Sequence, residues 1–366
     1  MNKYFQLIKN VLASVEESEL NIPVRETGID SIDLVVIRVA LEKCTGKEIP
    51  NEEWNNFKTI QQAIDYCRKH ESENLNVTDL INPVITTRKQ EINMPQMVNS
   101  ALSENWLFKE LGDIHWKLIC KGLNTKSSEI KDEEGKRLYA TFTRIRISGS
   151  TLYNFIENDY LMFQGQLKRF GFSTYISEVS FQNKNQSYKA SLMTSFSTRD
   201  SIDNSKLFKS QPVSAKNQIP EYPSTPDILN DYRLLRKNLL KSFSLNSEEF
   251  DLSGAPITEI RYNINPFYEI NGVGLLYFAA YPVISDKCES DHFNSTGKYG
   301  QWESKFFTTD RDIFYFANCN TDDSILYHLN SFEFIPENKV KLFSSLYRNS
   351  DMTLMAHIFT IKTKRT

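Results

Sequence analysis

The 366-residue sequence lacks the features that would place it in a membrane or on nucleic acid. It has no stretch near the roughly 18 consecutive apolar residues that a membrane-spanning helix needs. Its 43 lysines and arginines are offset by 46 aspartates and glutamates, so there is no basic excess to bind nucleic acid or an anionic membrane surface. We expect its partners to be small molecules or other proteins.

Cysteine is scarce, and its spacing argues against a metal or redox site. The chain contains no C-x-x-C pair, which is the usual spacing for zinc or a redox couple. An odd number of distant cysteines fits reduced thiols, so we expect a cytoplasmic protein without a metal. The five cysteines are Cys44, Cys67, Cys120, Cys288 and Cys319.

The first 70 residues have the pattern of a small helical module. Apolar residues recur at helical spacing between residues 5 and 15, and a polar loop then leads to the sequence GIDSID at residues 28–33. A second helix starts there and ends at Gly46. Residues 59–62 read as a capping box for a last helix. The pattern predicts an all-α four-helix bundle over residues 1–70.

Ser31 lies at the expected start of the second helix. Backbone N–H groups and the positive end of the helix dipole favour an attached phosphodiester there, although a plain N-cap serine is the alternative. This helix has an expected buried face formed by Ile32, Val35, Val36 and Val39. The residues that it leaves for a partner or for water are Asp33, Arg38, Glu42 and Lys43.

The order of these elements, with EIP at residues 48–50, resembles acyl and peptidyl carrier proteins over residues 1–70. The resemblance implies that Ser31 carries a covalent 4'-phosphopantetheine whose thiol holds acyl groups, and that a phosphopantetheinyl transferase is a partner. Arg38 and Lys43 make the second helix less acidic than is usual in such proteins. The choice of partner enzymes therefore stays open.

The remainder of the chain predicts an α+β fold. Residues 71–90 are polar and without periodicity, which is typical of a linker. An amphipathic helix follows Ser103, and residues alternate with period two in a series of segments after it. A helix followed by several strands is an α+β pattern. The expected strands cover residues 138–148, 160–169, 174–181 and 188–197.

Two blocks of sequence recur at nearly the same offset. Residues 91–93 (EIN) reappear at 269–271, and the pattern L-x-R with a later threonine at 167–174 reappears at 346–353. Such an offset favours a tandem duplication. A long helix with an antiparallel sheet, present twice, predicts a double hot-dog fold. Its expected parts are repeat 1 (91–199), a connecting segment (200–255) and repeat 2 (256–366).

Five separated blocks resemble the bifunctional acyltransferase/decarboxylase of leinamycin-type polyketide biosynthesis over residues 91–366. The resemblance implies that the CoA thioester methylmalonyl-CoA is the substrate, that CO2 is released, and that propionyl is delivered to a carrier, here the fused one. Downstream polyketide synthase or β-branching enzymes would then use the propionyl group. The blocks are residues 94–97, 102–116, 137–146, 271–282 and 314–318.

The same resemblance gives Tyr139 the role of a relay nucleophile, whereas its pattern alone fits one more aromatic residue in a strand. Tyrosine is a weak nucleophile at its free pKa of about 10, so it needs a base or cation nearby. The candidate charges are Arg137, Arg144 and Arg169.

Decarboxylation also needs donors aimed at the enolate oxygen in a dry pocket. The candidate donors are Ser103, Asn105, Asn271, Gly272 and Gly274, and Ser103 is first of all a helix N-cap.

Other functions stay open at this point. Glu269 matches the acidic position of hot-dog thioesterases, but it also fits a hydrogen-bond acceptor at the start of a helix. His115 is a candidate base, although a capped or surface histidine is the better interpretation. The alternatives to acyl transfer are a thioesterase acting on carrier-bound acyl groups and a non-catalytic scaffold that docks carriers. The oligomeric state is also open, with a homodimer among the options.

Overall fold

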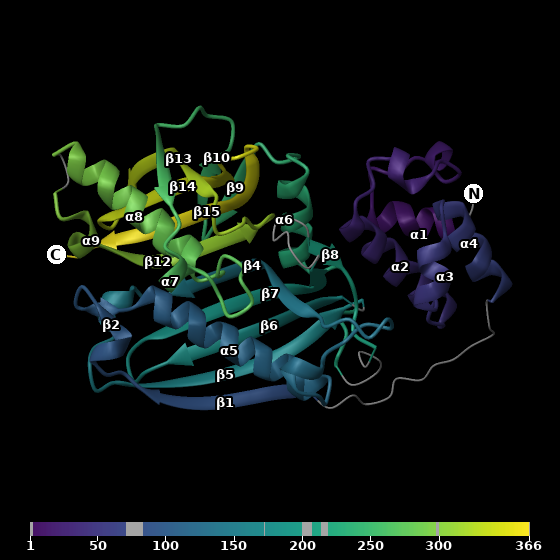
Figure 1. The fold of residues 1–366 in the computed structure, drawn as a ribbon, viewed down its shortest axis with the longest axis horizontal. Helices are drawn as coiled ribbons and strands as arrows, with labels where there is room; N and C mark the ends of the chain where they lie inside the picture. Colours follow the sequence, from purple (N-terminus) through teal and green to yellow (C-terminus); the bar gives the residue numbers. More distant parts are fainter. Residues whose placement is uncertain are drawn as a thin grey trace.

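The computed structural model describes residues 3–70, 83–171, 173–199, 207–213, 219–297 and 300–365. Two parts are evident in Figure 1. Residues 3–70 form the helical module in which the sequence predicts a carrier, and we call it the carrier module after that prediction. Residues 83–365 form a large antiparallel sheet with helices, which we call the sheet unit. No helix in the described ranges is long and apolar enough to cross a membrane.

The carrier module contains the four α-helices α1 (Lys3–Val11), α2 (Ser31–Thr45), α3 (Asn51–Asn56) and α4 (Ile60–Lys69). As predicted, α2 begins with Ser31 and is followed by Gly46 in the left-handed region. Asp30 is the N-cap, and its carboxylate accepts the N–H of Ile32 at 2.7 Å. The carboxylate of Asp33 in turn accepts the N–H of Asp30 at 3.1 Å, so the two aspartates form a capping box.

The apolar face predicted for α2 does not point into the carrier's own core. That core takes Ile37 and Leu41 from α2, whereas the predicted face packs on the sheet unit beside Phe170, Ile176 and Met193. The predicted burial of this face is confirmed, but what covers it was not predicted, because periodicity reveals an apolar side without revealing its partner. The residues concerned are Ile32, Val35, Val36 and Val39.

One sheet runs through the whole sheet unit in the order β1-β5-β6-β7-β4-β12-β15-β14-β13-β11, and β8 pairs with β7. Its first half contains β1 (Val84–Glu91), β4 (Tyr139–Gly149), β5 (Tyr160–Phe170), β6 (Thr174–Gln182), β7 (Ser187–Arg199) and β8 (Leu207–Lys209). Its second half contains β11 (Thr258–Asn263), β12 (Phe306–Tyr315), β13 (Ser324–Ile335), β14 (Lys339–Arg348) and β15 (Thr353–Lys364). Two small hairpins accompany it, β2 (Met97–Val98) with β3 (Ala101–Leu102) and β9 (Ser242–Leu245) with β10 (Glu248–Asp251).

Helices cover both faces of this sheet. On one face lie α5 (Glu104–Gly122) over the first half and α8 (Ala280–Ser295) over the second, with the short helices α7 (Pro266–Glu269) and α9 (Trp302–Lys305) beside α8 (Figure 1). The other face is covered by α6 (Asp227–Arg236), the β9–β10 hairpin and the carrier helix α2. The predicted connecting segment, 200–255, therefore supplies much of the cover of that second face.

The two halves of the sheet meet at a short seam. Strands β4 and β12 pair only through four residues each, from Arg144 to Ile147 and from Arg311 to Phe314. Residues 139–143 of β4 extend beyond the end of β12 and pair only with β7 among the described strands. The halves thus separate next to the start of β4.

The start of the sheet unit differs from the predicted linker. Residues 71–82 lie outside the described residues, but 84–90 belong to β1, which pairs with β5 at the edge of the sheet. The strand packs beside α5, and its exposed side chains are Ile85, Thr87 and Lys89, of which two are polar. An edge strand of this kind has the composition of a linker, which explains the error.

The strands from β1 to the seam follow one another in the same pattern as the strands from β11 to the seam, and α5 and α8 lie at matching places on the two halves. In this order β5 corresponds to β13 and β6 to β14. The sequence match between 167–174 and 346–353 instead relates the β5–β6 turn to the β14–β15 turn. The sequence block at 167–174 and 346–353 therefore matches two hairpins that do not occupy corresponding places in the sheet.

Asp310 provides a test of the seam's electrostatics. It lies at a bulge of β12, and burial raises the pKa of its carboxyl to about 6, although the Gly149 N–H and the Asn246 side chain favour the ionised form. Because the folded-state pKa is above the unfolded value, stability falls as pH rises from about 4 to about 6. We expect Asp310→Asn to raise the free energy of unfolding at pH 7 by up to about 3 kcal/mol. Urea unfolding should show little gain near pH 4, and an equal gain at both pH values would contradict this account.

Candidate functional site

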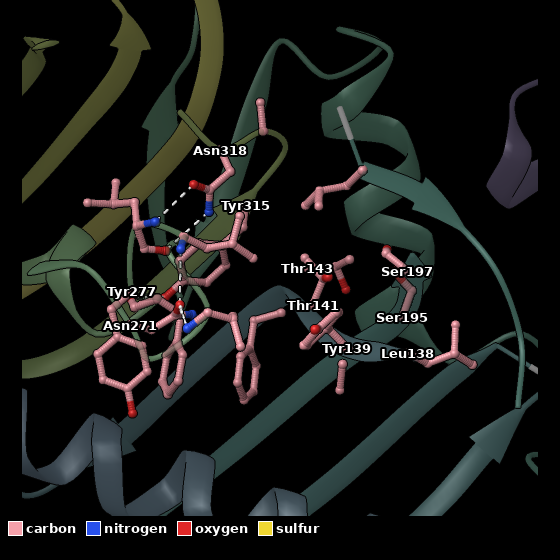
Figure 2. Close-up of a pocket in the computed structure, with 18 of the residues that line it drawn as sticks. Leu138, Tyr139, Thr141, Thr143, Ser195, Ser197, Asn271, Tyr277, Tyr315 and Asn318 are labelled. Atoms are coloured by element: carbon pink, nitrogen blue, oxygen red, sulfur yellow. Dashed lines mark hydrogen bonds between the residues drawn. The ribbon is translucent and has the colours of Figure 1, made fainter. Parts of the chain in front are cut away.

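A cavity with a volume of about 540 Å³ follows the seam and is lined by several of the predicted residues. Five consecutive residues of β4, from Tyr139 to Thr143, line it, so it runs along the edge of this strand and not against one face. The opposite wall is the loop before α8, including Asn271 and Tyr277, and the end of β12 at Tyr315 (Figure 2). The cavity thus occupies the place where the two halves of the sheet separate.

Tyr139 and Arg137 are brought together at this cavity. Both line it, and the Arg137 guanidinium carbon lies 5.1 Å from the centre of the Tyr139 ring. This is the geometry of a cation–π contact. Of the three candidate arginines, Arg137 is thus the one that lies beside Tyr139 at the cavity.

The loop before α8 is held rigidly by two asparagines. The Asn271 side-chain oxygen accepts the N–H groups of Val273 and Leu275, each at 3.0 Å. Asn318 was not proposed as a site residue, although it ends one of the quoted blocks; its amide exchanges two hydrogen bonds with the main chain of Leu276, at 3.0 and 3.1 Å (Figure 2). These bonds fix the wall that faces Tyr139.

The two glycines of this loop have different positions. Gly272 lines the cavity, and a Cβ atom added to it would meet open space. Gly274 does not line the cavity, and its N–H donates to the Asn271 carbonyl oxygen at 2.9 Å. Its φ of 80° shows that it serves the turn. Gly272 therefore remains a candidate donor, and Gly274 is used in the turn.

Four other predicted residues, besides Arg169, lie outside the cavity lining. Ser103 caps α5 by accepting the Trp106 N–H at 3.3 Å, which confirms its expected N-cap role. The Asn105 amide donates to the Ala279 carbonyl oxygen at 3.0 Å. Glu269, the last residue of α7, accepts the Asn265 N–H at 2.7 Å and the Tyr262 hydroxyl, so both of its carboxylate oxygens are engaged. The fourth residue is Arg144.

Arg144 and Arg169 are both committed elsewhere. Arg144 is buried and forms two hydrogen bonds with Asp312, at 2.9 and 2.7 Å, and a third with Asp231 at 3.0 Å, so it joins β4, β12 and α6. Arg169 lies 3.2 Å from Glu221 and donates to the Gly171 carbonyl oxygen. Neither lines the cavity with Tyr139. Sequence could not separate them from Arg137, because all three lie in or next to strand-like segments.

His115 is buried, contrary to the prediction of a surface or capped histidine. Its ring nitrogens lie 2.7 Å from the Ser177 hydroxyl and 2.8 Å from the Thr194 hydroxyl, and burial lowers its pKa to about 3. The ring packs near Phe142, which lines the cavity. His115 therefore supports the cavity wall as a neutral residue.

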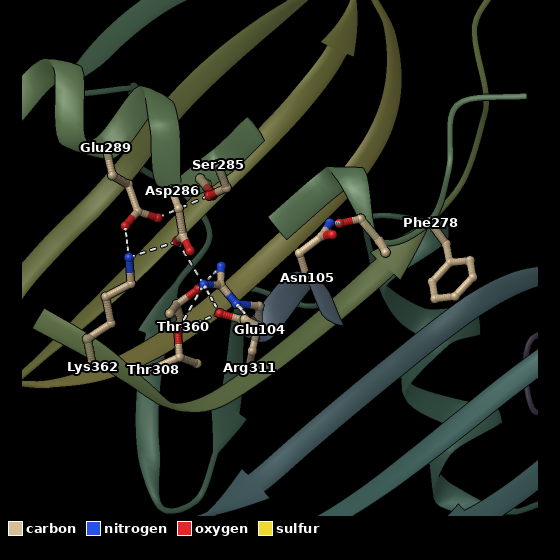
Figure 3. A network of polar contacts seen from close by, with 12 residues as sticks. Glu104, Asn105, Phe278, Ser285, Asp286, Glu289, Thr308, Arg311, Thr360 and Lys362 are labelled. Carbon is tan, nitrogen blue, oxygen red and sulfur yellow. Dashed lines mark hydrogen bonds and ion pairs between the residues drawn. The ribbon is translucent and has the colours of Figure 1, made fainter. Parts of the chain in front are cut away.

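The place that corresponds to the cavity in the other half of the unit is filled. There, the starts of α5 and β12 meet in a buried ionic network around Arg311 (Figure 3). Arg311 lies 2.5 Å from a Glu104 oxygen and donates to Asp286 at 2.8 Å, and Lys362 pairs with both Asp286 and Glu289. The sheet unit thus has a cavity at one end of its seam and a buried ionic network at the other.

Two cations that the sequence reading missed extend the cavity toward the carrier. Lys209 and Arg236 line it, and Lys209 also lines a second hollow bordered by Ser31. Burial would raise the pKa of the Asp30 carboxyl, but hydrogen bonds from the Asp33 and Ile32 N–H groups and the charges of Arg236 and Lys209 lower it. Both cations are therefore close to the residue before Ser31. The basic run RLLRK at residues 233–237 could have indicated Arg236 as a candidate.

Comparison with known proteins assigns a class to each part. Residues 5–67 match the family described as "Phosphopantetheine attachment site", so the N-terminal module is a carrier domain. The chain is similar in structure to an oleoyl thioesterase from Lactobacillus plantarum (10% identity, TM-score 0.56, covering 78% of this chain and 98% of that chain). It is also similar to the 12:0-ACP thioesterase from Umbellularia californica (8%, 0.54, 77% and 95%). The sheet unit therefore has a hot-dog thioesterase-like fold.

The surroundings of Ser31 fit the group that this family carries. Ser31 is exposed at the first position of α2, where the helix dipole favours a phosphodiester. Lys209 and Arg236 add positive charge on the side that leads to the cavity. A bound phosphopantetheine supplies the thiol that holds an acyl group. The described residues contain no cluster of three or more histidine, cysteine or acidic side chains placed to hold a metal.

Proposed function

We propose that the sheet unit transfers acyl groups from CoA thioesters to the carrier module of the same protein, with Ser31 as the attachment point. One observation carries this proposal: Lys209 borders both the hollow at Ser31 and the cavity that contains Tyr139. In its specific form the substrate is methylmalonyl-CoA and the product is propionyl on the carrier, for β-alkyl branching of a polyketide by downstream synthase or branching enzymes.

Two bonds of methylmalonyl-CoA break in this reaction. The bond to the carboxylate breaks, CO2 leaves, and its electron pair passes to the thioester carbonyl as an enolate, which takes a proton from solvent. The bond between the acyl group and the CoA sulfur then breaks as the Tyr139 oxygen attacks, and the tyrosine proton goes to the departing CoA thiolate. The carrier thiol finally takes the acyl group and returns its proton to Tyr139. No other reactant is needed.

The cavity residues supply distinct parts of this chemistry. Arg137, stacked on Tyr139, stabilises charge on the phenol oxygen during attack. The Gly272 N–H and the Asn271 amide are the donors proposed for the enolate oxygen. Aromatic side chains such as Phe142 and Phe278, whose rings lie 4.2 Å apart, keep water from this wall.

Hydrolysis is the second candidate, because the fold is thioesterase-like. A hydrolase needs a base to activate water. Among the described residues that line the cavity, Asp113 is the one carboxylate and there is no histidine. Asp113 is paired with Lys117 at 2.6 Å and Arg88 at 3.0 Å, and Glu269 is engaged by Tyr262. This composition favours transfer over hydrolysis. A non-catalytic docking scaffold is the third candidate.

Intact mass spectrometry separates these functions. The protein is first modified by a phosphopantetheinyl transferase and then given malonyl-, methylmalonyl- or propionyl-CoA separately. We expect methylmalonyl-CoA to add a propionyl mass to the phosphopantetheine arm on Ser31, whereas the Ser31→Ala variant has no arm and can hold the acyl group only on Tyr139. Retention of the carboxyl group on the protein would disprove decarboxylation. Release of the free acid would indicate a thioesterase. If no CoA ester acylates the protein, the non-catalytic scaffold is the function that remains.

A further inference from the structure

The carrier helix α2 is fitted closely to the sheet unit. Gly171, in the turn between β5 and β6, has a φ of 62°, and a Cβ atom added to it would come within 2.9 Å of Val39 and 3.0 Å of Val35. The carrier can approach this turn closely only because it has no side chain there. Ile32 and Val36 continue the contact toward α6 within one apolar cluster.

An ionic clamp lies beside this apolar contact. The Asp33 carboxylate is fully buried and accepts two hydrogen bonds from Arg233 of α6, at 2.9 and 2.7 Å, and one from Lys237. Arg233 is itself buried. A buried carboxylate between two cations loses its hydration, so the contact is favourable only while all three charges meet.

Polar contacts secure the farther parts of the interface. The Lys43 ammonium, near the end of α2, donates to the carbonyl oxygens of Tyr222 and Pro223 at 2.7 and 3.1 Å. The Asn51 amide of α3 donates to Glu133 of the sheet unit at 2.8 Å. The interface therefore extends along the whole of α2, and it orients the carrier as well as holding it.

This orientation places Ser31 at the hollow that shares Lys209 with the cavity, and we call this place the cavity mouth. Ser31 stays exposed, while Asp30 and Asp33 on either side of it face Arg236, Lys209 and the clamp. Arg236 follows Arg233 by one turn of α6, so the same helix supplies the clamp and one cation of the mouth. The second cation comes from β8.

We propose that the carrier module is the dedicated, cis-acting partner of the sheet unit: Asp33, Arg233 and Lys237 clamp α2, and Arg236 and Lys209 receive the phosphodiester on Ser31. This inference names the partner in the proposed function and rests on that function only for its loading step. The docked face of α2 is not available to another enzyme, so the carrier must leave the clamp before it passes its acyl group on.

Docking is tested first, in the unmodified full-length protein and without any substrate. Small-angle scattering at low salt should show a larger radius of gyration for Asp33→Asn and for the double variant Arg233→Met/Lys237→Met than for wild type. The triple variant should have a radius of gyration little larger than that of Asp33→Asn, because either change already removes the contact between Asp33 and the two cations. Asp65→Asn is the matched control, since Asp65 on α4 pairs within the carrier with Arg68 at 3.0 Å. Unchanged radii in both clamp variants would overturn the proposal.

A failure of the carrier to fold is kept apart from a failure to dock. Asp33 also caps α2, so Asp33→Asn could weaken the carrier itself. The Arg233→Met/Lys237→Met variant leaves the carrier sequence intact, and modification of Ser31 by a phosphopantetheinyl transferase reports on its fold. Loss of docking in this double variant, with normal modification, supports the clamp.

Loading in cis is tested by dilution and by mixing. Wild-type loading should have a rate independent of protein concentration, and a Ser31→Ala chain mixed with a Tyr139→Phe chain should load about a hundredfold more slowly at micromolar concentration. Arg236→Gln should slow loading with an unchanged radius of gyration. Efficient loading in the mixture would disprove cis transfer. If wild type accepts no acyl group, the proposed function fails while the scattering result still decides docking.

Discussion

Replacing Tyr139 by phenylalanine should slow acylation of Ser31 from methylmalonyl-CoA by at least about a hundredfold. The substitution removes one oxygen from a strand residue at the cavity and leaves its ring under Arg137, so the fold is preserved. Without that oxygen the acyl group has no relay between CoA and the carrier thiol. The rate is measured by intact mass, with propionyl-CoA formation followed in parallel.

Tyr160→Phe is the matched control, because Tyr160 is an exposed residue of β5 outside the cavity lining. It should load at the wild-type rate. If Tyr139→Phe still produces propionyl-CoA but does not acylate Ser31, the tyrosine acts in transfer alone. Loading by Tyr139→Phe at the wild-type rate would show that the carrier thiol attacks CoA thioesters directly.

Replacing Arg311 by methionine should lower the free energy of unfolding by about 3–5 kcal/mol. Arg311 is fully buried, and it is the cation next to Glu104 while Asp286 also has Lys362. Burial already raises the pKa of Glu104 against the opposing charge of Arg311. Without Arg311, Glu104 must keep an unpaired charge or take up a proton, and either is unfavourable near neutral pH.

Urea unfolding measures this effect, with Lys117→Met as the control for loss of a cation. Lys117 pairs with Asp113 at 2.6 Å, and both side chains are about half exposed, so we expect a loss below about 1 kcal/mol. Lower pH should partly restore the Arg311→Met variant, because protonation of Glu104 removes its unpaired charge. A loss no larger than that of Lys117→Met would show that the network contributes little to stability.

Much of the local structure could be predicted from the sequence. Alternation identified β4 to β7 to within a few residues, and the hydroxyl of Ser103 marked the start of α5. The start of α2 at Ser31 was equally legible, since a loop, a small polar residue and an apolar periodicity follow one another there. These features depend on neighbours in the chain.

Features that depend on distant residues could not be predicted in this way. Asp33 was correctly left for a partner, but its partners, Arg233 and Lys237, are about 200 positions away. Arg144 was grouped with Tyr139 because both lie on one strand, yet a bulge in β4 at residue 143 and the carboxylate of Asp312 direct it elsewhere. Long-range pairing and bulges leave little trace in a single sequence.

The short seam between β4 and β12 has a consequence for how the protein avoids self-association. A strand edge without a partner normally offers its N–H and C=O groups to strands of other molecules and promotes aggregation. Here the edge of residues 139–143 faces the cavity and lies opposite the loop that contains Asn271. A strand of another molecule would have to enter this cavity in order to pair with it. The protein can therefore keep an open strand edge for a narrow, extended ligand without exposing it to other strands.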